Sequence, residues 1–247
     1  MRYFLQALNF LTTIPFKNRS HDLCADALTF FPLAGLTLGL ILSAIAMLFY
    51  YLGFSQMVLG VNLTVILIIL TGGIHLDGLS DTFDAVAGGR TKEEKLSIMR
   101  DPHAGAIGTI SMICAILLEA ALLSSFNISS LITALILATT ISRWSMVASI
   151  FLFKYARSQG KAKTFIEGKK PEFFIFSTAI TIIVILSVSN LTAILLMVIS
   201  FITVCLLGKW SSSKLGGITG DILGATNEIC EVILLLTYYT GKIICRI

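Results

Sequence analysis

Long apolar runs with few charges dominate this chain and constrain its fold more than any other feature. Apolar residues make up 56% of the 247 positions and charged residues only 13%, about half of the roughly 25% that is usual for a soluble domain. A helix needs about 20 apolar residues to cross the hydrocarbon core of a bilayer. The weak alternation typical of an outer-membrane barrel is missing. The sequence therefore predicts an all-α, polytopic transmembrane helical bundle.

Hydropathy along the chain predicts six to seven spans in one integral membrane domain over residues 1–247. We expect short helices on the membrane surface between the spans and no attached soluble domain. With seven spans, Lys242 and Arg246 would lie on the outer side, which leaves open a re-entrant or shallow last helix. The predicted spans are residues 28–52, 57–74, 105–126, 129–153, 172–188, 191–208 and 222–241.

The distribution of basic residues predicts the orientation of the spans. Lysine and arginine lie in the N-terminal segment and in residues 76–104, 154–171 and 209–215, whereas the connections GFSQ, SFNIS and SVSN carry none. By the positive-inside rule, the basic connections face the cytoplasm. The unusual polar clusters lie in the same connections, so we expect an active site that faces the cytoplasm. The net charge of +4 follows from this bias and indicates no nucleic-acid partner.

The segment GGIHLDGLSDTFDAVAGG gathers three aspartates in a chain that otherwise avoids charge. Asp77, Asp81 and Asp84 stand at i, i+4 and i+7, so a helix places them within about 60° on one face. Near a bilayer, three uncompensated carboxylates would cost on the order of 8–10 kcal/mol, at about 2.5–3.5 kcal/mol each. Mg²⁺ on that face would offset this cost, and it typically takes carboxylates together with substrate phosphates. The pattern favours a magnesium site over a solvated helix end whose acids face water, Arg90 or Lys92.

Residues on both sides of the aspartates extend the candidate site. His75 lies two positions before Asp77, so it turns inward only if the preceding glycines break the helix, and structural and catalytic roles stay open. Arg90 and Arg100 are candidate substrate-binding residues, although the positive-inside bias also explains them. The stretch DPHAGAIG then begins a helix whose glycines and amides suit a phosphate, while Asp101 is equally explained as a helix cap.

Two further groups of basic residues are candidate phosphate ligands. Arg143 lies inside the fourth predicted span, where an arginine indicates a functional site by default. The alternative partner is Glu119, but the two residues differ in depth by about 10 Å at 1.5 Å per residue, which disfavours the pair. Arg157 and Lys161, in the connection KYARSQGKAKTFIEGKK, either bind substrate phosphates or follow the orientation rule.

A second acidic, glycine-rich stretch, GGITGDILGATNEICEV, lies near the end of the chain. Asp221, Gly224 and Glu228 fall on one helical face, with Glu231 close by. Gly220 would let the backbone come close to a ligand. This stretch strengthens the prediction of a divalent metal site, with Asp221 and Glu228 as further ligands beside the three earlier aspartates.

Several ordered motifs resemble the cobalamin synthase family. They are LNFLTTIPF, FFPLAGLTLG, GGIHLDGLSDTFDAVAGGR, IMRDPHAGAIG, SRWSMV and GGITGDILGATNE, in this order along the chain. The resemblance covers most of the chain, but residues 165–207 match only in hydrophobicity. A further departure is DPH, which stands where the family has a DSR-like stretch.

The resemblance implies a Mg²⁺-dependent transferase in the prokaryotic cytoplasmic (inner) membrane, acting in nucleotide loop assembly during cobalamin biosynthesis. It would join adenosylcobinamide-GDP with α-ribazole, or with α-ribazole 5′-phosphate, and release GMP. Asp81 or Asp84 would accept the proton of the attacking group, with His75 as a further catalytic candidate. The implied partners are these small molecules and the lipid bilayer. A homo-oligomer and a complex with other corrinoid-pathway enzymes both stay open.

Two other classes of membrane protein share parts of this pattern. A CDP-alcohol phosphotransferase needs D-x-x-D-G-x-x-A-R followed by G-x-x-x-D-x-x-x-D, and HLDGLSDTFD has neither the Ala-Arg pair nor the later aspartate spacing. An ion-coupled transporter predicts internal repeats and broken helices near the middle of the membrane. The acidic residues of this chain are instead expected on one side.

Overall fold

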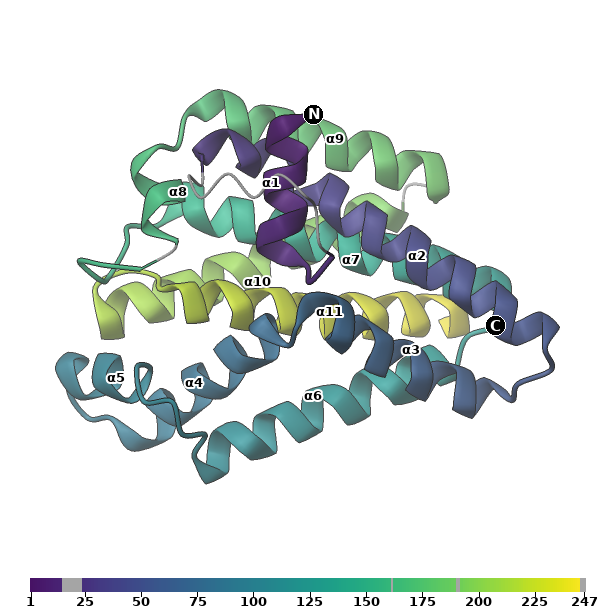
Figure 1. Ribbon diagram of the computed structural model, residues 1–247, viewed down its shortest axis with the longest axis horizontal. Coiled ribbons are helices and arrows are strands. Elements are labelled where there is room, and N and C mark those ends of the chain that lie inside the picture. Colours follow the sequence, from purple (N-terminus) through teal and green to yellow (C-terminus); the bar gives the residue numbers. More distant parts are fainter. Residues whose placement is uncertain (15–23, 161, 190–191, 245–247) are drawn as a thin grey trace.

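The computed structural model of the protein describes residues 1–14, 24–160, 162–189 and 192–244 (Figure 1). Within these residues the chain is helical and contains no strand, which confirms the predicted all-α class. The elements are α1 (Arg2–Leu11), the 3₁₀-helix η1 (Ala25–Phe30), α2 (Phe31–Tyr51), α3 (Gln56–Thr71), α4 (Ile74–Gly88), α5 (Lys92–Ile98), α6 (Ala106–Ser124), α7 (Ile128–Leu152), α8 (Lys163–Glu167), α9 (Pro171–Val188), α10 (Thr192–Leu215) and α11 (Gly220–Ile244).

Six helical segments of the described chain are long and apolar enough to cross a membrane. They are Ala25–Tyr51, Ala106–Ser124, Ile128–Leu152, Pro171–Val188, Ala193–Leu215 and Gly220–Lys242. Helices α3 and α4 pass the same test only as a pair, bent by 90°. The prediction of six to seven spans is therefore confirmed. The second predicted span, 57–74, ends earlier than expected, because the chain breaks and continues as the acidic helix α4.

Two glycines make the break between α3 and α4. Gly72 and Gly73 have φ angles of 65° and 68°, in the left-handed region that other residues rarely adopt. The N-terminal segment covers the break: the Thr13 amide donates to the Leu70 carbonyl at 2.7 Å, and its hydroxyl donates to the Ile69 carbonyl at 2.9 Å. These carbonyls lie in the last turn of α3, where the Ile69 carbonyl accepts only a long bond of 3.2 Å from the Gly72 amide. Thr13 therefore supplies donors to groups that would be costly to leave unpaired in a membrane.

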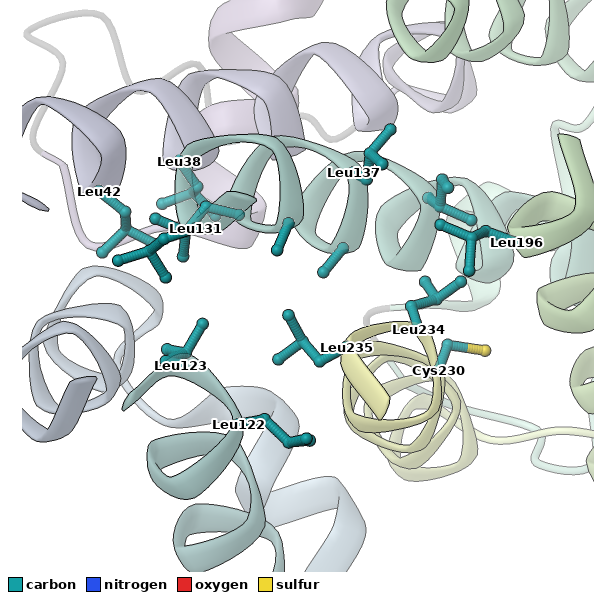
Figure 2. Packing of buried hydrophobic residues seen from close by; sticks show 14 of the residues in the cluster. Leu38, Leu42, Leu122, Leu123, Leu131, Leu137, Leu196, Cys230, Leu234 and Leu235 are labelled. Carbon is teal, nitrogen blue, oxygen red and sulfur yellow. The ribbon is translucent and has the colours of Figure 1, made fainter. Parts of the chain in front are cut away.

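Helix α7 forms the centre of the bundle. In its most apolar stretch of 18 residues, 89% of the residues are buried, and the helix packs against α2, α9, α10 and α11. Figure 2 shows leucines of several helices pointing toward one another around it, among them Leu38 of α2, Leu131 of α7 and Leu235 of α11. Lipid tails are as apolar as leucine, so this cluster stabilises the bundle mainly through close van der Waals packing.

Three of the predicted basic connections lie at the same end of the molecule. Figure 1 shows α5, α8 and the turn between α10 and α11 together at the left, while the turn between α2 and α3 lies at the right. These three elements belong to residues 76–104, 154–171 and 209–215 or directly follow them. The gathering of basic connections on one side agrees with the orientation pattern found in the sequence.

Candidate active site

The acidic residues predicted on α4 and α11 meet where these two helices cross. Gly78 of α4 lies so close to α11 that an added Cβ would come within 2.7 Å of the Asp221 carbonyl oxygen. Gly224 of α11 also lies close to the α4 backbone, where a Cβ would be 3.2 Å from the His75 Cα. Small residues allow such close approach between helices. The two glycines thus place the aspartates of α4 beside the start of α11.

Three aspartates surround this crossing, and we call Asp77, Asp81 and Asp221 the aspartate group. Asp81 interacts electrostatically with both other members, and Asp77 also acts on Asp221. Asp77 is exposed, while Asp81 and Asp221 are partly buried. No hydrogen bond to another described residue engages the carboxylate of Asp77 or Asp81. Like charges this close repel one another, so the group favours a bound cation.

The aspartate group does not form a closed metal cage. Within the described residues, no three histidine, cysteine or acidic side chains converge as metal ligands do. Mg²⁺ does not need such a cage, because it is usually held by one or two carboxylates plus substrate phosphates and water. The oxygen donors of the aspartate group fit this mode of binding. The sequence analysis also expected Asp84 and Glu228 to bind the metal. The fold places these two carboxylates beside other partners, Asp84 at the start of α6 and Glu228 near His75.

Asp84 has a different environment from the other aspartates of α4. Its carboxylate accepts hydrogen bonds from the amides of Gly105, at 2.7 Å, and Gly108, at 2.8 Å. It thereby caps the N-terminus of α6, where an anion is favoured by free amides and the helix dipole. We expected a substrate phosphate at this corner, and the structure instead fills it with Asp84. A Cβ on either glycine would come within 2.5 Å of the carboxylate, so the contact requires glycine.

Arg157 supplies a positive charge to the aspartate group. One guanidinium nitrogen lies 2.6 Å from the Asp221 carboxylate and also donates to the Met99 carbonyl at 3.3 Å. The Thr219 hydroxyl donates to the same carboxylate at 3.3 Å. The side chains of Arg157 and Asp221 are 11% and 20% exposed, so solvent screens the pair only partly. The residue predicted to bind phosphate therefore lies within the candidate site.

A short backbone pairing holds Arg157 in this position. The Ala156 amide donates to the Ile218 carbonyl at 2.8 Å, and the Ile218 amide donates to the Lys154 carbonyl at 2.7 Å. This pairing joins the connection after α7 to the turn before α11. Tyr155 lies in the same connection, and burial raises the pKa of its phenol, so it stays a neutral hydrogen-bonding group.

Arg143 lies in a buried polar network rather than beside the aspartate group. Its side chain is 1% exposed and forms an ion pair at 2.8 Å with Glu231, a residue 88 positions away. Asn227 donates to the same Glu231 carboxylate at 3.3 Å and lies 3.3 Å from the His75 ring. The sequence analysis disfavoured Glu119 as the partner of Arg143 and made Arg143 a candidate phosphate ligand, and the structure pairs it with Glu231 instead. Arg143 is thus already paired, and direct contact with a phosphate would require breaking this pair.

His75 turns inward, as expected if the glycines break the helix. It is 2% exposed, and its Nε2 has no hydrogen-bond partner in the described structure. Its Nδ1 lies 4.0 Å from the Glu228 carboxylate. Glu228 itself lies seven positions after Asp221, about 10 Å further along the helix. His75 and Glu228 therefore belong to the buried side of the α4–α11 contact, away from the aspartate group.

Comparison with known proteins identifies the family. A model of the cobalamin-5-phosphate synthase family matches residues 3–239. The chain belongs to this family. An adenosylcobinamide-GDP ribazoletransferase of Roseiflexus sp. (strain RS-1) is 37% identical over 235 residues, which are 94% of this chain and 87% of the relative. A second one, of Acetivibrio thermocellus, is 37% identical over 248 residues, which are 98% and 99% of the two chains. No solved structure matches.

The other residues predicted to bind substrate in this cobalamin-5-phosphate synthase family member do not belong to the aspartate group. Arg90 and Arg100 are exposed next to α5, and Gly220 is exposed at the first position of α11. Lys161 lies outside the described residues. The sequence analysis missed Lys95, which is buried and donates to the carbonyls of Ala85, at 2.8 Å, and Gly89. It thereby caps the end of α4. The sequence signal for this role is the position of Lys95 directly after Thr91 and Glu94, which form a capping box at the start of α5.

Proposed function

We propose that this chain is an adenosylcobinamide-GDP ribazoletransferase. It joins adenosylcobinamide-GDP with α-ribazole, or with α-ribazole 5′-phosphate, and releases GMP. The observation that carries the proposal is the family match over residues 3–239, together with relatives of that name that align over nearly the full chain. The aspartate group supports the proposal, since a pyrophosphate substrate requires a site that can hold cations.

The proposed cofactor is Mg²⁺, held by Asp77, Asp81 and Asp221. Their carboxylate oxygens are the hard donors that this ion prefers, and pyrophosphate oxygens and water would complete its coordination. When bound, Mg²⁺ would neutralise charge on the pyrophosphate and on the departing GMP. Arg157 would neutralise part of the same negative charge, because its guanidinium can turn from Asp221 to a phosphate oxygen. Arg90 and Arg100 are proposed to attract the anionic substrate from the surrounding solution.

The proposed reaction is a displacement at the phosphorus that carries the cobinamide arm. A ribose hydroxyl of the acceptor forms the new oxygen–phosphorus bond, and the bond from this phosphorus to the bridging oxygen breaks. GMP leaves with that oxygen. In α-ribazole 5′-phosphate, the 5′ oxygen already carries the phosphate. The attacking hydroxyl that both acceptors share must therefore be another hydroxyl of the ribose. Positioning and charge neutralisation contribute most of the rate in such transfers.

Asp81 is the proposed acceptor of the hydroxyl proton, through the carboxylate oxygen that Mg²⁺ would leave free. It is partly buried, and no hydrogen bond to another described residue occupies its carboxylate. Asp84 is less suited to the role, because both of its oxygens already accept amide hydrogen bonds from α6. A carboxylate held in this way is weakly basic. We therefore assign Asp84 to positioning α4 against α6.

The proposed location is the prokaryotic cytoplasmic membrane, with the aspartate group open to the cytoplasm. The basic connections at the same end of the bundle support this orientation. The bend between α3 and α4 also occurs in ion-coupled transporters, where freed carbonyls coordinate ions. Here Thr13 already bonds two of the carbonyls at the bend. The bend therefore favours the enzyme over the transporter.

A direct assay tests the proposed function. The detergent-solubilised protein is incubated with adenosylcobinamide-GDP, α-ribazole and Mg²⁺, and GMP and the corrinoid product are measured by mass spectrometry. We expect equal amounts of both products, and none when Mg²⁺ is removed by chelation. Hydrolysis to GMP without a joined corrinoid, or no turnover by folded protein, would contradict the proposal.

A further inference from the structure

Three segments that are far apart in the sequence meet beside Asp221. The connection after α7 pairs with the turn before α11, where Tyr155 and Ile218 form a parallel bridge. The end of α5 lies against this connection, because Arg157 donates to the Met99 carbonyl at 3.3 Å. The same Arg157 guanidinium pairs with Asp221 at 2.6 Å. Side chains from all three segments therefore lie near this member of the aspartate group.

Tyr155 faces the same region as Arg157. The backbone around Tyr155 is extended, since its two neighbours in the sequence both form hydrogen bonds with Ile218. Side chains two positions apart on an extended backbone lie on the same side. This geometry places the Tyr155 phenol on the side of the Arg157 guanidinium. The electrostatic interactions agree, because Arg157, Asp221 and Arg100 all act on the phenol.

The hydroxyl of Tyr155 forms no hydrogen bond with another described residue. The side chain is partly buried, and its ring packs against the hydrophobic cluster that contains Met99, Leu215 and Ile218. This packing involves the ring and does not need the hydroxyl. The hydroxyl is thus held at a defined place and is available to a ligand.

Gly160 lies directly against this hydroxyl. A Cβ at position 160 would overlap the Tyr155 oxygen. The φ angle of Gly160 is 146°, in a region that other residues rarely adopt. The close contact fixes the position of the hydroxyl relative to the connection that carries Arg157.

The charges around the hydroxyl favour an anion with oxygen acceptors. Arg100 and Arg157 stay positively charged at any physiological pH. Arg100 directly follows Met99, whose carbonyl accepts from Arg157. Burial raises the pKa of the Tyr155 phenol, so it stays protonated and adds a donor without adding charge. Guanidinium groups and a hydroxyl together provide the hydrogen bonds that phosphate oxygens accept.

We infer that the Tyr155 hydroxyl donates a hydrogen bond to a pyrophosphate oxygen of adenosylcobinamide-GDP, which Arg100 and Arg157 also bind. The inference rests on the proposed function. Asp221 connects these three residues to the proposed Mg²⁺ site, because it pairs with Arg157 and interacts electrostatically with Asp77. A pyrophosphate that contacts Mg²⁺ at the aspartate group therefore lies beside Tyr155.

Removing the hydroxyl alone tests the inference. Tyr155→Phe keeps the ring that packs against the hydrophobic cluster. The matched control is Tyr239→Phe, since Tyr239 is also partly buried but lies about 27 Å further along α11 than Asp221, at 1.5 Å per residue. Thermal unfolding establishes that each variant is folded.

We expect Tyr155→Phe to raise KM for adenosylcobinamide-GDP at least about tenfold, the usual effect of losing one hydrogen bond to a charged group. KM for α-ribazole should stay the same, and Tyr239→Phe should change neither constant. An unchanged KM for adenosylcobinamide-GDP in Tyr155→Phe would overturn the inference. So would a rise confined to KM for α-ribazole 5′-phosphate, because the hydroxyl would then bind the phosphate of the acceptor.

A second pair of variants tests the position of the hydroxyl. In Gly160→Ala, the added Cβ would displace the Tyr155 hydroxyl, so KM for adenosylcobinamide-GDP should also rise. The same glycine change in Tyr155→Phe should raise KM by a smaller factor, because the hydroxyl is already missing. Equal factors in the two backgrounds would overturn the placement of the hydroxyl.

Direct binding of GDP separates this inference from the proposed function. Equilibrium dialysis with GDP and Mg²⁺, without corrinoid or riboside, should show binding to the wild type and to Tyr239→Phe. Binding to Tyr155→Phe should be at least about tenfold weaker. This difference in a protein without transferase turnover would contradict the proposed function and leave the role of Tyr155 intact. Turnover with equal GDP binding and equal KM in Tyr155→Phe would contradict only the role of Tyr155.

Discussion

The aspartate group and the buried Arg143 network both include residues of α11, yet their charged side chains have opposite environments. In the network, Arg143 and Glu231 are almost completely buried, lie 2.8 Å apart and share hydrogen bonds with Ser142 and Asn227. In the aspartate group, one arginine pairs with Asp221, while the exposed Asp77 and the partly buried Asp81 have no hydrogen-bond partner among the described residues. Buried charges are tolerated when they are paired. Carboxylates without partners, such as those of Asp77 and Asp81, instead indicate a site that binds a cation.

Replacing an aspartate of the group should give the largest effect on turnover. We expect Asp81→Asn and Asp77→Asn to lower the rate of GMP release by at least about 10³-fold, because each removes charge that acts on the transition state. The thermal unfolding temperature should stay the same or rise, since the change relieves repulsion. Steady-state assays with Mg²⁺ would check this. Glu172→Gln, at an exposed position of α9, is the matched control and should keep full activity.

Breaking the Arg143 network should instead affect stability. Removing one partner of a buried ion pair typically lowers the free energy of unfolding by about 3–5 kcal/mol, because it leaves an uncompensated charge. We expect this loss in Arg143→Met, measured by unfolding in detergent, and its partial recovery in the double variant Arg143→Met/Glu231→Leu. Normal stability with lost turnover in Arg143→Met would show that Arg143 acts on substrate and would remove the contrast between the two regions.

A change at the crossing of α4 and α11 should have a smaller effect on activity. In Gly78→Ala, the added Cβ would come within 2.7 Å of α11 and push the two helices apart. Displacement of catalytic groups by about 1 Å can lower turnover about 10²-fold. Gly88→Ala is the control on the same helix, because its Cβ would meet only the flexible end of Ile98. Equal kcat values in the two variants would show that the crossing does not position the aspartate group.

The smallest effect is expected at the bend between α3 and α4. Thr13→Val removes the hydroxyl that donates to Ile69 at 2.9 Å, while its amide still donates to Leu70. We expect the free energy of unfolding to fall by about 0.5–1.5 kcal/mol, the usual contribution of one hydrogen bond. Thr133→Val, which loses only a bond within its own helix, is the control. If both variants unfold alike, Thr13 does not stabilise the bend.

Several features of the fold follow directly from the sequence. Hydropathy alone predicts the helical class and the number of spans, and the i, i+4 spacing predicts that Asp77 and Asp81 share a helix face. The second acidic stretch then brings Asp221 to the same place, as the structure confirms through the contact between Gly78 and Asp221. These predictions succeed because they depend on local periodicity and on the properties of a lipid environment.

Other features depend on how the helices rotate and cross, which local patterns do not encode. Arg143 pairs with Glu231 across 88 positions, and Asp84 caps a helix that begins 22 positions later. The sequence analysis assigned close approach to a ligand to Gly220, whereas Gly78 and Gly224 bring the helices together at the α4–α11 crossing. Glycines at several positions of this chain mark close helix contacts, and this signal could have predicted the crossing.

Metal binding gives the most direct test of the central claim, that the aspartate group holds a divalent cation for catalysis. Mn²⁺ replaces Mg²⁺ as a spectroscopic probe, and electron paramagnetic resonance counts free ions in solutions of the detergent-solubilised protein with GDP. We predict Mn²⁺ binding to the wild type and to Glu172→Gln, and at least tenfold weaker binding to Asp77→Asn and Asp81→Asn. Equal Mn²⁺ binding by all four proteins would contradict the account.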